Sequence, residues 1–232
     1  MSAILEAHGL KKSYAGGPVL HGLDLEVFPG KIVGVVGPNG CGKTTMFKIF
    51  AGLINDYIGT VAIDGRPVGV HTKSVTSFLP EKTYLDDGMK IIGTLNFFSD
   101  FYDDFDRVKA LEMLARFQLD PSMKIKTMSK GMQEKMQLIL VMSRAAKLYI
   151  LDEPLNGIDP AARDSILDII LKNYSENSAV LLSTHLIYDV ERIFDEVVMM
   201  RMGSIIASGD ADELREKSGK SLNDYFREVF KC

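Results

Sequence analysis

The sequence predicts an α/β fold in which a core with a mostly parallel sheet carries an antiparallel β lobe at its N-terminus and an inserted helical subdomain. Three observations support this prediction. A continuously apolar strand at 31–36 runs into a Gly-rich turn and a helix, strands alternate with helices through the second half, and the pattern is helical between about 85 and 128. The chain has 232 residues, 46% of them hydrophobic, which suits a single domain with a sizeable core.

Composition and charge exclude several classes of protein. With 27 basic and 31 acidic residues the formal net charge is −4, so the chain lacks the basic excess typical of nucleic-acid binding, and we expect no nucleic-acid partner. The longest apolar run, near Leu138–Met142, ends at Ser143 and is far shorter than the ~20 residues of a membrane-spanning helix. The first residues show no signal peptide, and the two cysteines, Cys41 and Cys232, fit a reducing cytosol. We therefore expect a cytoplasmic globular protein.

The first eighty residues consist mainly of strands, which we expect at Ile4–Leu10, Val19–Phe28, 31–36, 60–63 and Val75–Leu79. The second of them alternates apolar and polar residues, as a half-buried antiparallel strand does. The strand at 31–36 is apolar throughout, so we expect it to be buried on both faces. A helix at Lys43–Leu53 follows the Gly-rich turn and ends near Gly52.

The region from about 85 to 128 has a helical pattern with two apolar stripes. The first stripe consists of Phe97, Phe98, Phe101, Tyr102 and Phe105, and the second of Val108, Leu111, Ala115 and Leu119. Such stripes usually pack into a core, although the aromatic stripe is also compatible with a groove for a partner. The acidic residues beside it are expected to form a solvated face; they are Asp100, Asp103, Asp104 and Asp106.

Helices and strands alternate through the rest of the chain. Ser129 can cap a helix with an apolar face, and Asp159-Pro160 opens another helix. Further strands are expected at 148–151, Ala179–Ser183, Val197–Met200 and Ile205–Ser208, with a helix from about 186 and a helical tail from 210. We divide this single domain, 1–232, into a β lobe and RecA-like core at 1–84 and 146–232 and a helical subdomain at 85–145.

The strongest motif is the segment 37–45, which fits the phosphate loop G-x-x-x-x-G-K-[ST] between a buried strand and a helix. Its glycines let backbone N–H groups approach phosphate oxygens, and the helix N-terminus adds partial positive charge. We expect Lys43 to hold the β- and γ-phosphates and the Thr44 hydroxyl to coordinate Mg²⁺. The candidate nucleotide-binding residues here are Asn39, Gly40, Cys41, Gly42, Lys43, Thr44 and Thr45. The motif predicts that the chain binds a nucleoside triphosphate.

A second motif is the apolar run 148–151 followed by Asp152-Glu153-Pro154. Asp152, at the end of a buried strand, can reach the Mg²⁺ shell beside the phosphate loop. Glu153 can polarise a water molecule for attack on the γ-phosphate, as a general base. Without the phosphate loop, the same residues would indicate an ordinary surface turn.

These motifs resemble those of the nucleotide-binding subunits of ATP-binding cassette (ABC) transporters, and the likeness covers nearly the whole chain. The segment Ser129–Gln133 is similar to the family's signature, commonly Leu-Ser-Gly-Gly-Gln, and lies upstream of Asp152. The resemblance implies that Ser129, Gly131 and Gln133 contact ATP held by a second subunit, so that two ATP molecules join a head-to-tail dimer. Ser129 is equally compatible with a plain helix N-cap.

Further site residues depend on the resemblance. His185 resembles the switch histidine that contacts the γ-phosphate, with a structural histidine as the alternative. Tyr14 resembles the aromatic residue that stacks on adenine, with an edge-strand tyrosine as the alternative. Asp159 belongs to a segment, Asn156–Asp159, that resembles the loop communicating across the dimer. Glu81 stands where the family usually has a Gln that senses Mg²⁺ and the permease; its carboxylate can still bind the metal, with an added charge, and Glu81 counts among the candidate nucleotide and Mg²⁺ contacts.

Cys41 lies inside the phosphate loop, near a helix N-terminus and Lys43. Such surroundings lower the pKa of a thiol, so we expect maleimide to modify Cys41 and block ATP binding, and MgATP to protect it. The alternative is a small inert residue in a tight loop.

The resemblance implies that the chain is the ATP-hydrolysing subunit of an ABC transporter of the bacterial export type. It would work with a separate transmembrane permease and with a second nucleotide-binding subunit, identical or related. We then expect it to be cytoplasmic and peripheral on the inner face of the cell membrane. Two alternatives stay open: a soluble ABC-type ATPase not engaged in transport, and a nucleotide-sensing adaptor with little turnover.

Overall fold

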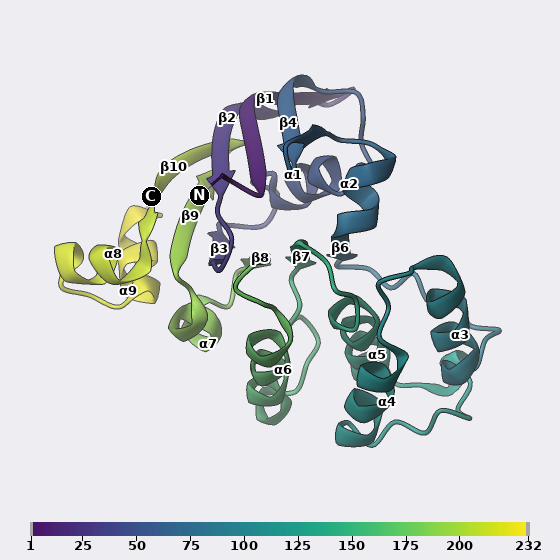
Figure 1. The fold of residues 1–232 in the computed structure, drawn as a ribbon. Coiled ribbons are helices and arrows are strands. Elements are labelled where there is room, and N and C mark those ends of the chain that lie inside the picture. Colours follow the sequence, from purple (N-terminus) through teal and green to yellow (C-terminus); the bar gives the residue numbers. More distant parts are fainter. Residues whose placement is uncertain (1, 231–232) are drawn as a thin grey trace.

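The computed structural model describes residues 2–230, apart from the side chain of Ala161; Cys232 lies outside the described residues. The chain forms two sheets, with helix α1 (Lys43–Phe50) between them and most other helices on the far side of the second sheet (Figure 1). Buried residues of α1 share one core cluster with residues of both sheets. This arrangement confirms the predicted α/β fold.

The first sheet is antiparallel, with the strand order β2-β1-β4-β5. Its strands are β1 Leu5–Tyr14, β2 Gly17–Val27, β4 Ile58–Ile63 and β5 Arg66–Pro67. In β2 the residues Leu23, Leu25 and Val27 are buried and their neighbours are not, which confirms the predicted half-buried strand. The sequence did not predict β5 or helix α2 (Val70–Val75), since two and six residues are too short for a periodic signal.

The second sheet has the order β10-β9-β3-β8-β7-β6, and its strands are parallel except for β10. The strands are β3 Ile32–Val36, β6 Thr76–Leu79, β7 Leu148–Asp152, β8 Ala179–Thr184, β9 Glu196–Arg201 and β10 Ser204–Asp210. Because parallel strands end at the same edge of a sheet, the loops after β3, β6, β7 and β8 meet there. Those loops carry the segment 37–42, Glu81, Glu153 and His185.

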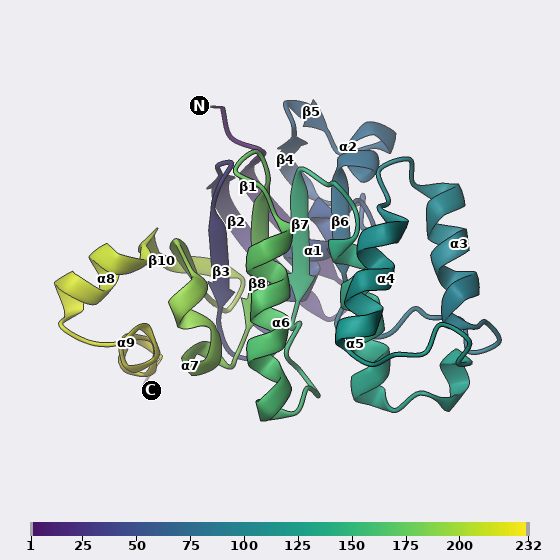
Figure 2. The same ribbon diagram turned by 60° about the horizontal axis from the view of Figure 1, so that its bottom comes forward.

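The helices lie in two groups (Figures 1 and 2). Beyond β6 lie α3 (Ile91–Phe101), α4 (Arg107–Arg116), a 3-10 turn (Ile125–Thr127) and α5 (Lys130–Met142). Across the second sheet lie α6 (Pro160–Asn173), α7 (Ile187–Val190) and a 3-10 turn (Glu191–Ile193), and beside its β10 edge lie α8 (Ala211–Ser218) and α9 (Leu222–Val229). Within residues 2–230, none of these helices has the length and apolar character needed to cross a membrane.

The apolar stripes of the helical region are only partly buried. Phe98 and Phe105 pack against the core, but Phe97 and Phe101 are 52% and 67% exposed, so the prediction of a core role is wrong for these two. The second stripe is confirmed for Leu111 and Leu119, which pack into the core, and wrong for Val108 and Ala115, which are exposed. The fully buried residues of α4 lie outside the predicted stripe; they are Ala110, Met113 and Leu114. Helix α4 packs against both α3 and α5, and its own sequence does not reveal which of its faces these helices bury.

A buried arginine joins the helical region to the second sheet. Arg144 donates hydrogen bonds to Asp104, through Nε at 2.9 Å and Nη2 at 3.1 Å. The same guanidinium donates to the carbonyl oxygens of Ser74 and Thr76, at 2.6 and 2.8 Å. Asp104 therefore has a structural partner, and the prediction of a solvated face is wrong for it.

Candidate active site

The loop 37–42 leaves β3 and turns sharply into α1. Gly37 has no room for a side chain, since a Cβ there would lie 2.4 Å from the carbonyl oxygen of Met200 and 2.7 Å from Sγ of Cys41. Gly42 is the N-cap of α1 with a φ of 108°, a conformation that L-residues rarely adopt. The loop therefore wraps around the N-terminus of α1, an arrangement in which backbone N–H groups bind phosphate.

Lys43, the first residue of α1, is buried with its ammonium group inside this loop. Nζ donates hydrogen bonds to the carbonyl oxygens of Gly37, at 2.7 Å, and Pro38, at 3.2 Å. The same atom lies 3.9 Å from Oε1 of Glu153. Lys43 thus provides a positive charge between the loop and the strand edge, where the motif predicts phosphate groups.

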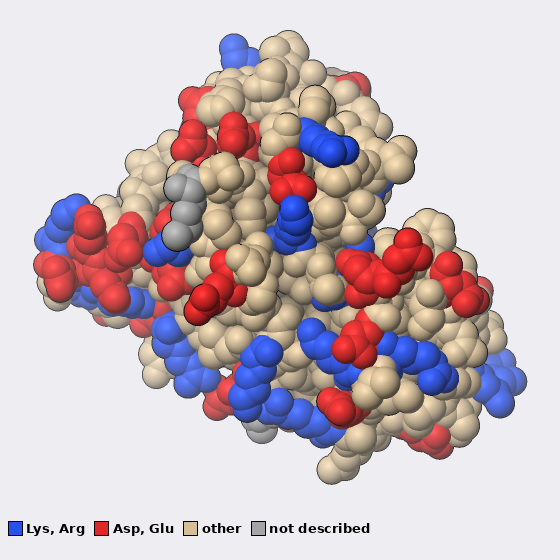
Figure 3. All heavy atoms as spheres, in the orientation of Figure 1, with Lys and Arg blue, Asp and Glu red and all other residues tan. Residues whose placement is uncertain are grey.

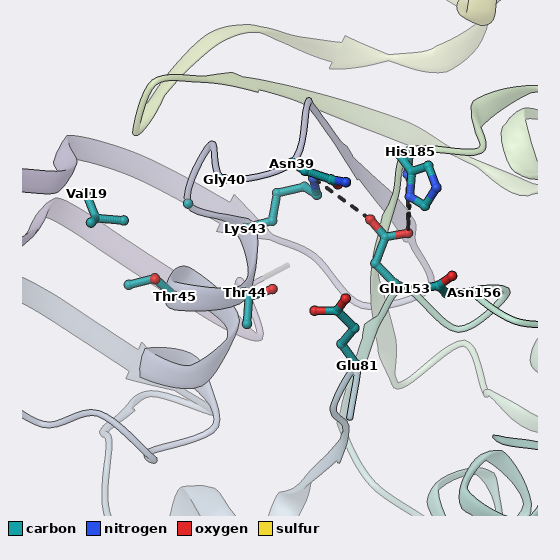
Figure 4. Close-up of a pocket in the computed structure, with 11 residues that line it drawn as sticks. Val19, Asn39, Gly40, Lys43, Thr44, Thr45, Glu81, Glu153, Asn156 and His185 are labelled. Carbon is teal, nitrogen blue, oxygen red and sulfur yellow. Dashed lines mark hydrogen bonds and ion pairs between the residues drawn. The ribbon is translucent and has the colours of Figure 1, made fainter. Parts of the chain in front are cut away.

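Glu153 follows β7 and bridges Lys43 and His185, as Figure 4 shows. Its Oε2 lies 2.8 Å from Nδ1 of His185, and the His185 backbone N–H donates to the same oxygen at 3.4 Å. The backbone N–H of Glu153 donates to Oγ of Ser183 at 2.9 Å. Its φ is 53°, which is uncommon for a residue other than glycine and is typical of functional positions held by their surroundings.

Asp152 ends β7 and is 1% exposed. Its Oδ1 accepts a hydrogen bond from Oγ of Ser183 at 2.6 Å, whereas Oδ2 is buried without a hydrogen-bond partner. Burial raises the pKa of the Asp152 carboxyl group, the Ser183 and Thr44 hydroxyls oppose this shift, and the charge of Glu81 adds to it. A buried, unpartnered carboxylate oxygen near the Thr44 hydroxyl and a second carboxylate suits a divalent cation.

These elements surround a pocket of about 320 Å³ at the carboxyl ends of the parallel strands (Figure 4). The predicted site residues that line it are Asn39, Gly40, Gly42, Lys43, Thr44, Thr45, Glu81, Glu153 and His185. The carboxylate of Glu81 points toward Thr44 in Figure 4.

Three residues of this region were not predicted to lie at the pocket, although one of them, Asn156, belongs to the predicted segment Asn156–Asp159. Val19 and Asn156 line the pocket, and Ser183 holds both Asp152 and Glu153 from the neighbouring strand. Val19 and Ser183 lie in predicted strands. Ser183 reaches the site because β8 pairs with β7, and Val19 because it lies beside Gly42, where a Cβ would be 3.2 Å from the Val19 carbonyl oxygen.

The predicted site residues that do not line the pocket are Tyr14, Cys41, Ser129, Gly131, Gln133, Asp152 and Asp159. Ser129 is the N-cap of α5, with its Oγ accepting from the N–H of Met132 at 3.3 Å, which confirms the capping role. The start of α5 also touches the segment Asn156–Asp159, because a Cβ on Gly157 would lie 2.4 Å from Oε1 of Glu134.

Tyr14 lies at the end of β1 with its ring half exposed. The ammonium group of Lys12 lies 4.7 Å from the centroid of this ring. Lys12 is itself buried and paired with Asp56 at 2.5 Å. The stacking of Tyr14 on adenine stays a prediction.

Cys41 is not the reactive thiol that its place in the loop suggests. Its side chain is 4% exposed, belongs to the core cluster around α1 and does not line the pocket. Burial raises the pKa of the Cys41 thiol, and this effect outweighs the charge of Lys43, which lowers it. The expectation of a lowered pKa is therefore wrong, because the loop turns Sγ toward Gly37 and the core.

We expect Cys41 to react with maleimide at least about tenfold more slowly in the native chain than in the unfolded chain, since a raised pKa leaves little thiolate at neutral pH. A Cys232→Ser variant leaves Cys41 as the single thiol, and mass spectrometry can follow its labelling with and without urea. Fast labelling of the native protein that MgATP suppresses would restore the reactive-thiol hypothesis.

Comparison with known proteins places the chain among ATP-binding subunits. Residues 20–156 match the family described as ABC transporter. Nod factor export ATP-binding protein I of Cupriavidus metallidurans is 30% identical over 222 residues, which cover 92% of this chain and 73% of that protein. A solved structure of an ATP-binding subunit of an ABC transporter superposes with a TM-score of 0.89 at 27% identity, covering 98% of this chain and all of that one. The fold is also shared with cbiO1 from Clostridium perfringens, part of the ABC transporter complex cbiONQ, at a TM-score of 0.77 and 21% identity over 94% of this chain and 92% of that one.

Proposed function

The chain belongs to the ABC transporter family as an ATP-binding subunit with ATPase activity, and we propose that its catalytic site is the pocket between the loop 37–42 and His185. The observation that carries this proposal is the placement of the Glu153 carboxylate. It lies at the pocket, 3.9 Å from the Lys43 ammonium group and 2.8 Å from the His185 ring. A carboxylate held beside a phosphate loop can accept a proton from attacking water.

ATP is bound at the phosphate loop in this proposal. The N–H groups of residues 39–45 and the ammonium group of Lys43 hold its phosphates, and Tyr14 stacks on its adenine. The residues proposed for Mg²⁺ are Thr44, Asp152 and Glu81. In the described part of the chain no three His, Cys, Asp or Glu side chains lie close enough to hold a metal by themselves. This fits Mg²⁺, which is usually held by one or two carboxylates together with phosphate and water oxygens and which neutralises phosphate charge when bound.

Glu153 acts as the general base in the hydrolytic step. Its carboxylate takes a proton from the water that attacks the γ-phosphate, while Lys43 stabilises charge on the phosphate oxygens. His185 contacts the γ-phosphate and orients Glu153 through the 2.8 Å contact between Nδ1 and Oε2. Ser183 positions both acidic residues, since its Oγ contacts Oδ1 of Asp152 and the N–H of Glu153.

A second nucleotide-binding subunit, identical or related, completes the site in our proposal. Ser129, Gly131 and Gln133 do not line the pocket of their own chain, and Ser129 and Gly131 lie at the N-terminus of α5, where an anion is favoured. These residues would close over ATP held by the other subunit. Asp159 lies in the loop that touches the start of α5 and would relay this closure to Glu153.

A transmembrane permease is the other proposed partner, and it would hold the chain at the inner face of the membrane. We propose that residues 85–145 form a helical subdomain, distinct from the β lobe and core at 1–84 and 146–232. A groove of about 220 Å³ lies between this subdomain and β6. The exposed rings of Phe97 and Phe101 are stacked at 6.0 Å on the same helix that contributes Phe98 to this groove. We propose that a cytoplasmic segment of the permease docks here. The export function in the name of the Cupriavidus relative supports export as the direction.

Affinity purification tests this proposal. A tagged Glu153→Gln chain is recovered in MgATP from detergent-solubilised membranes of its native host, and its partners are identified by mass spectrometry. We expect the recovered partner to be a protein with several membrane-spanning segments. Its recovery should fall with a Phe101→Asp variant; because Phe101 is exposed, this substitution should leave the core intact. Soluble partners alone, with the chain absent from membranes, would favour a soluble ABC-type ATPase. A wild-type complex without ATP turnover would favour a nucleotide-sensing adaptor.

A further inference from the structure

The C-terminal helices α8 and α9 pack against the segment that follows His185 (Figures 1 and 2). We call residues 185–195 the switch segment; it contains α7 and the 3-10 turn Glu191–Ile193. It begins at the His185 contact with Glu153 and ends at Asp195, whose Oδ2 accepts from the N–H of Ile32 at 2.7 Å. The segment therefore runs from the catalytic pocket to the start of β3.

The two C-terminal helices have different surroundings. The apolar face of α9 packs against the main core and consists of Leu222, Tyr225, Phe226, Val229 and Phe230, which follow the i, i+3, i+4, i+7, i+8 spacing. Helix α8 contributes only Ala211 and Leu214 to that core. Its other residues are mostly charged, with acidic residues in its first turn and basic residues in its last, and charged side chains gather over it at the left of Figure 3. Most of the apolar contact between the hairpin and the core is thus made by α9.

Glu191 connects the switch segment to both helices. Its Oε2 accepts a hydrogen bond from the N–H of Asn223 at 2.9 Å, in the first turn of α9, where a carboxylate is favoured by the helix dipole. Its carbonyl oxygen accepts from the guanidinium of Arg215 on α8. A third bond, from the N–H of Ala211 to the carbonyl oxygen of Asp195 at 2.9 Å, holds the end of the segment.

The route from Glu191 back to His185 is short and tightly packed. The single short helix α7 lies between them, and its residues Ile187 and Val190 are buried. On the other side of Glu191, the ring of Phe194 fills the space beside Gly34 of β3, where a Cβ would lie 2.4 Å from it. Buried side chains therefore lie on both sides of Glu191 and leave little free space into which this part of the segment could move alone.

We propose that the C-terminal hairpin positions His185 through Glu191, and so sets the geometry of the Glu153–His185 pair. Glu191 is a positioning residue here. This inference rests on the function proposed above for His185. In this proposal the two C-terminal helices contribute to catalysis indirectly, by fixing the position of His185.

The test compares Glu191→Ala with Glu213→Ala. Glu213 lies on α8 in the same hairpin and pairs with Lys217 at the surface, so its loss leaves the switch segment untouched. The chain has 4 histidines, and an NMR spectrum of their rings reports His185 directly once a His185→Ala variant has assigned its signals. We expect Glu191→Ala to shift the His185 signals and lower kcat at least about fivefold with an unchanged KM for ATP, since small misplacements cost rate.

Glu191→Gln keeps an acceptor for the N–H of Asn223, so we expect it to restore most of the rate. Arg215→Gln removes the hydrogen bond from the Arg215 guanidinium to the Glu191 carbonyl oxygen, and it replaces Glu191→Ala as the test variant if Glu191→Ala does not fold. The proposal is overturned if the His185 signals stay in place in both Glu191→Ala and Arg215→Gln, or if Glu213→Ala moves them equally. If Glu191→Ala shifts the His185 signals but the wild-type chain shows no ATP turnover, the positioning is supported and the function proposed for the site is removed.

Discussion

Glu153→Gln should lower the steady-state ATPase rate at least about a hundredfold, because Gln cannot take a proton from the attacking water. Gln has nearly the same shape and keeps an oxygen that can accept from His185, so ATP binding should survive. The measurement pairs phosphate release with the affinity for a fluorescent ATP analogue. We expect kcat to fall and KM for ATP to stay nearly unchanged.

Glu81→Gln is the matched control for this prediction. It removes the same charge from the same pocket, but Gln is the residue usual in the family and keeps a side-chain oxygen for Mg²⁺, so we expect the rate to stay within about tenfold of wild type. A Glu153→Gln chain that keeps more than a tenth of its activity would assign the general base to another group. A Glu81→Gln chain that loses as much as Glu153→Gln would show that the loss follows the charge of the pocket rather than the proton acceptor.

Asp152→Asn should stabilise the chain without nucleotide and abolish ATP hydrolysis. The folded protein keeps Oδ2 of Asp152 buried and unpartnered, and burial raises the pKa of this carboxyl group. Asn removes the buried charge and retains an oxygen that can accept from Ser183. A gain of about 1 kcal/mol would raise Tm by about 2–4 °C in a chain of this size. The same change removes a proposed Mg²⁺ ligand, so turnover should fall at least about a hundredfold.

The sign of the pH dependence follows from the direction of the shift. A raised pKa means that the folded chain binds the Asp152 proton more tightly than the unfolded chain, so this carboxyl group costs stability as pH rises from its unfolded pKa through its folded pKa. The Tm advantage of Asp152→Asn should therefore be small near about pH 4 and largest near about pH 7.5. Scanning calorimetry over this range measures it. An Asn variant that melts below wild type at neutral pH would show that the carboxylate is stabilised rather than strained.

The phosphate loop and the Asp152-Glu153 pair could be predicted because their chemistry is local. A Gly-rich turn after a buried strand must bring N–H groups to a helix N-terminus, and a carboxylate after a buried strand must lie at the sheet edge. The buried strands could be predicted for the same reason, since their continuous apolar runs need no partner to be recognised.

Contacts between distant segments could not be predicted. Ser183 reaches Asp152 only because β8 pairs with β7 in this register, and Glu191 reaches Asn223 only because the chain returns to α7 at its end. Cys41 shows the same limit: the composition of its loop indicated a reactive thiol, whereas the path of the loop buries it. The buried face of α4 depended likewise on its neighbouring helices.

The claim that two such subunits close on ATP is tested most directly by the mass of the Glu153→Gln chain in solution. Light scattering should give one chain, 25.7 kDa, without nucleotide and twice that mass in saturating MgATP. Adding Gly131→Glu, which places a carboxylate beside the proposed phosphate position of the other subunit, should keep the chain at 25.7 kDa in MgATP. A Glu153→Gln chain that binds MgATP and remains a monomer, with or without its related subunit, would contradict the mechanism.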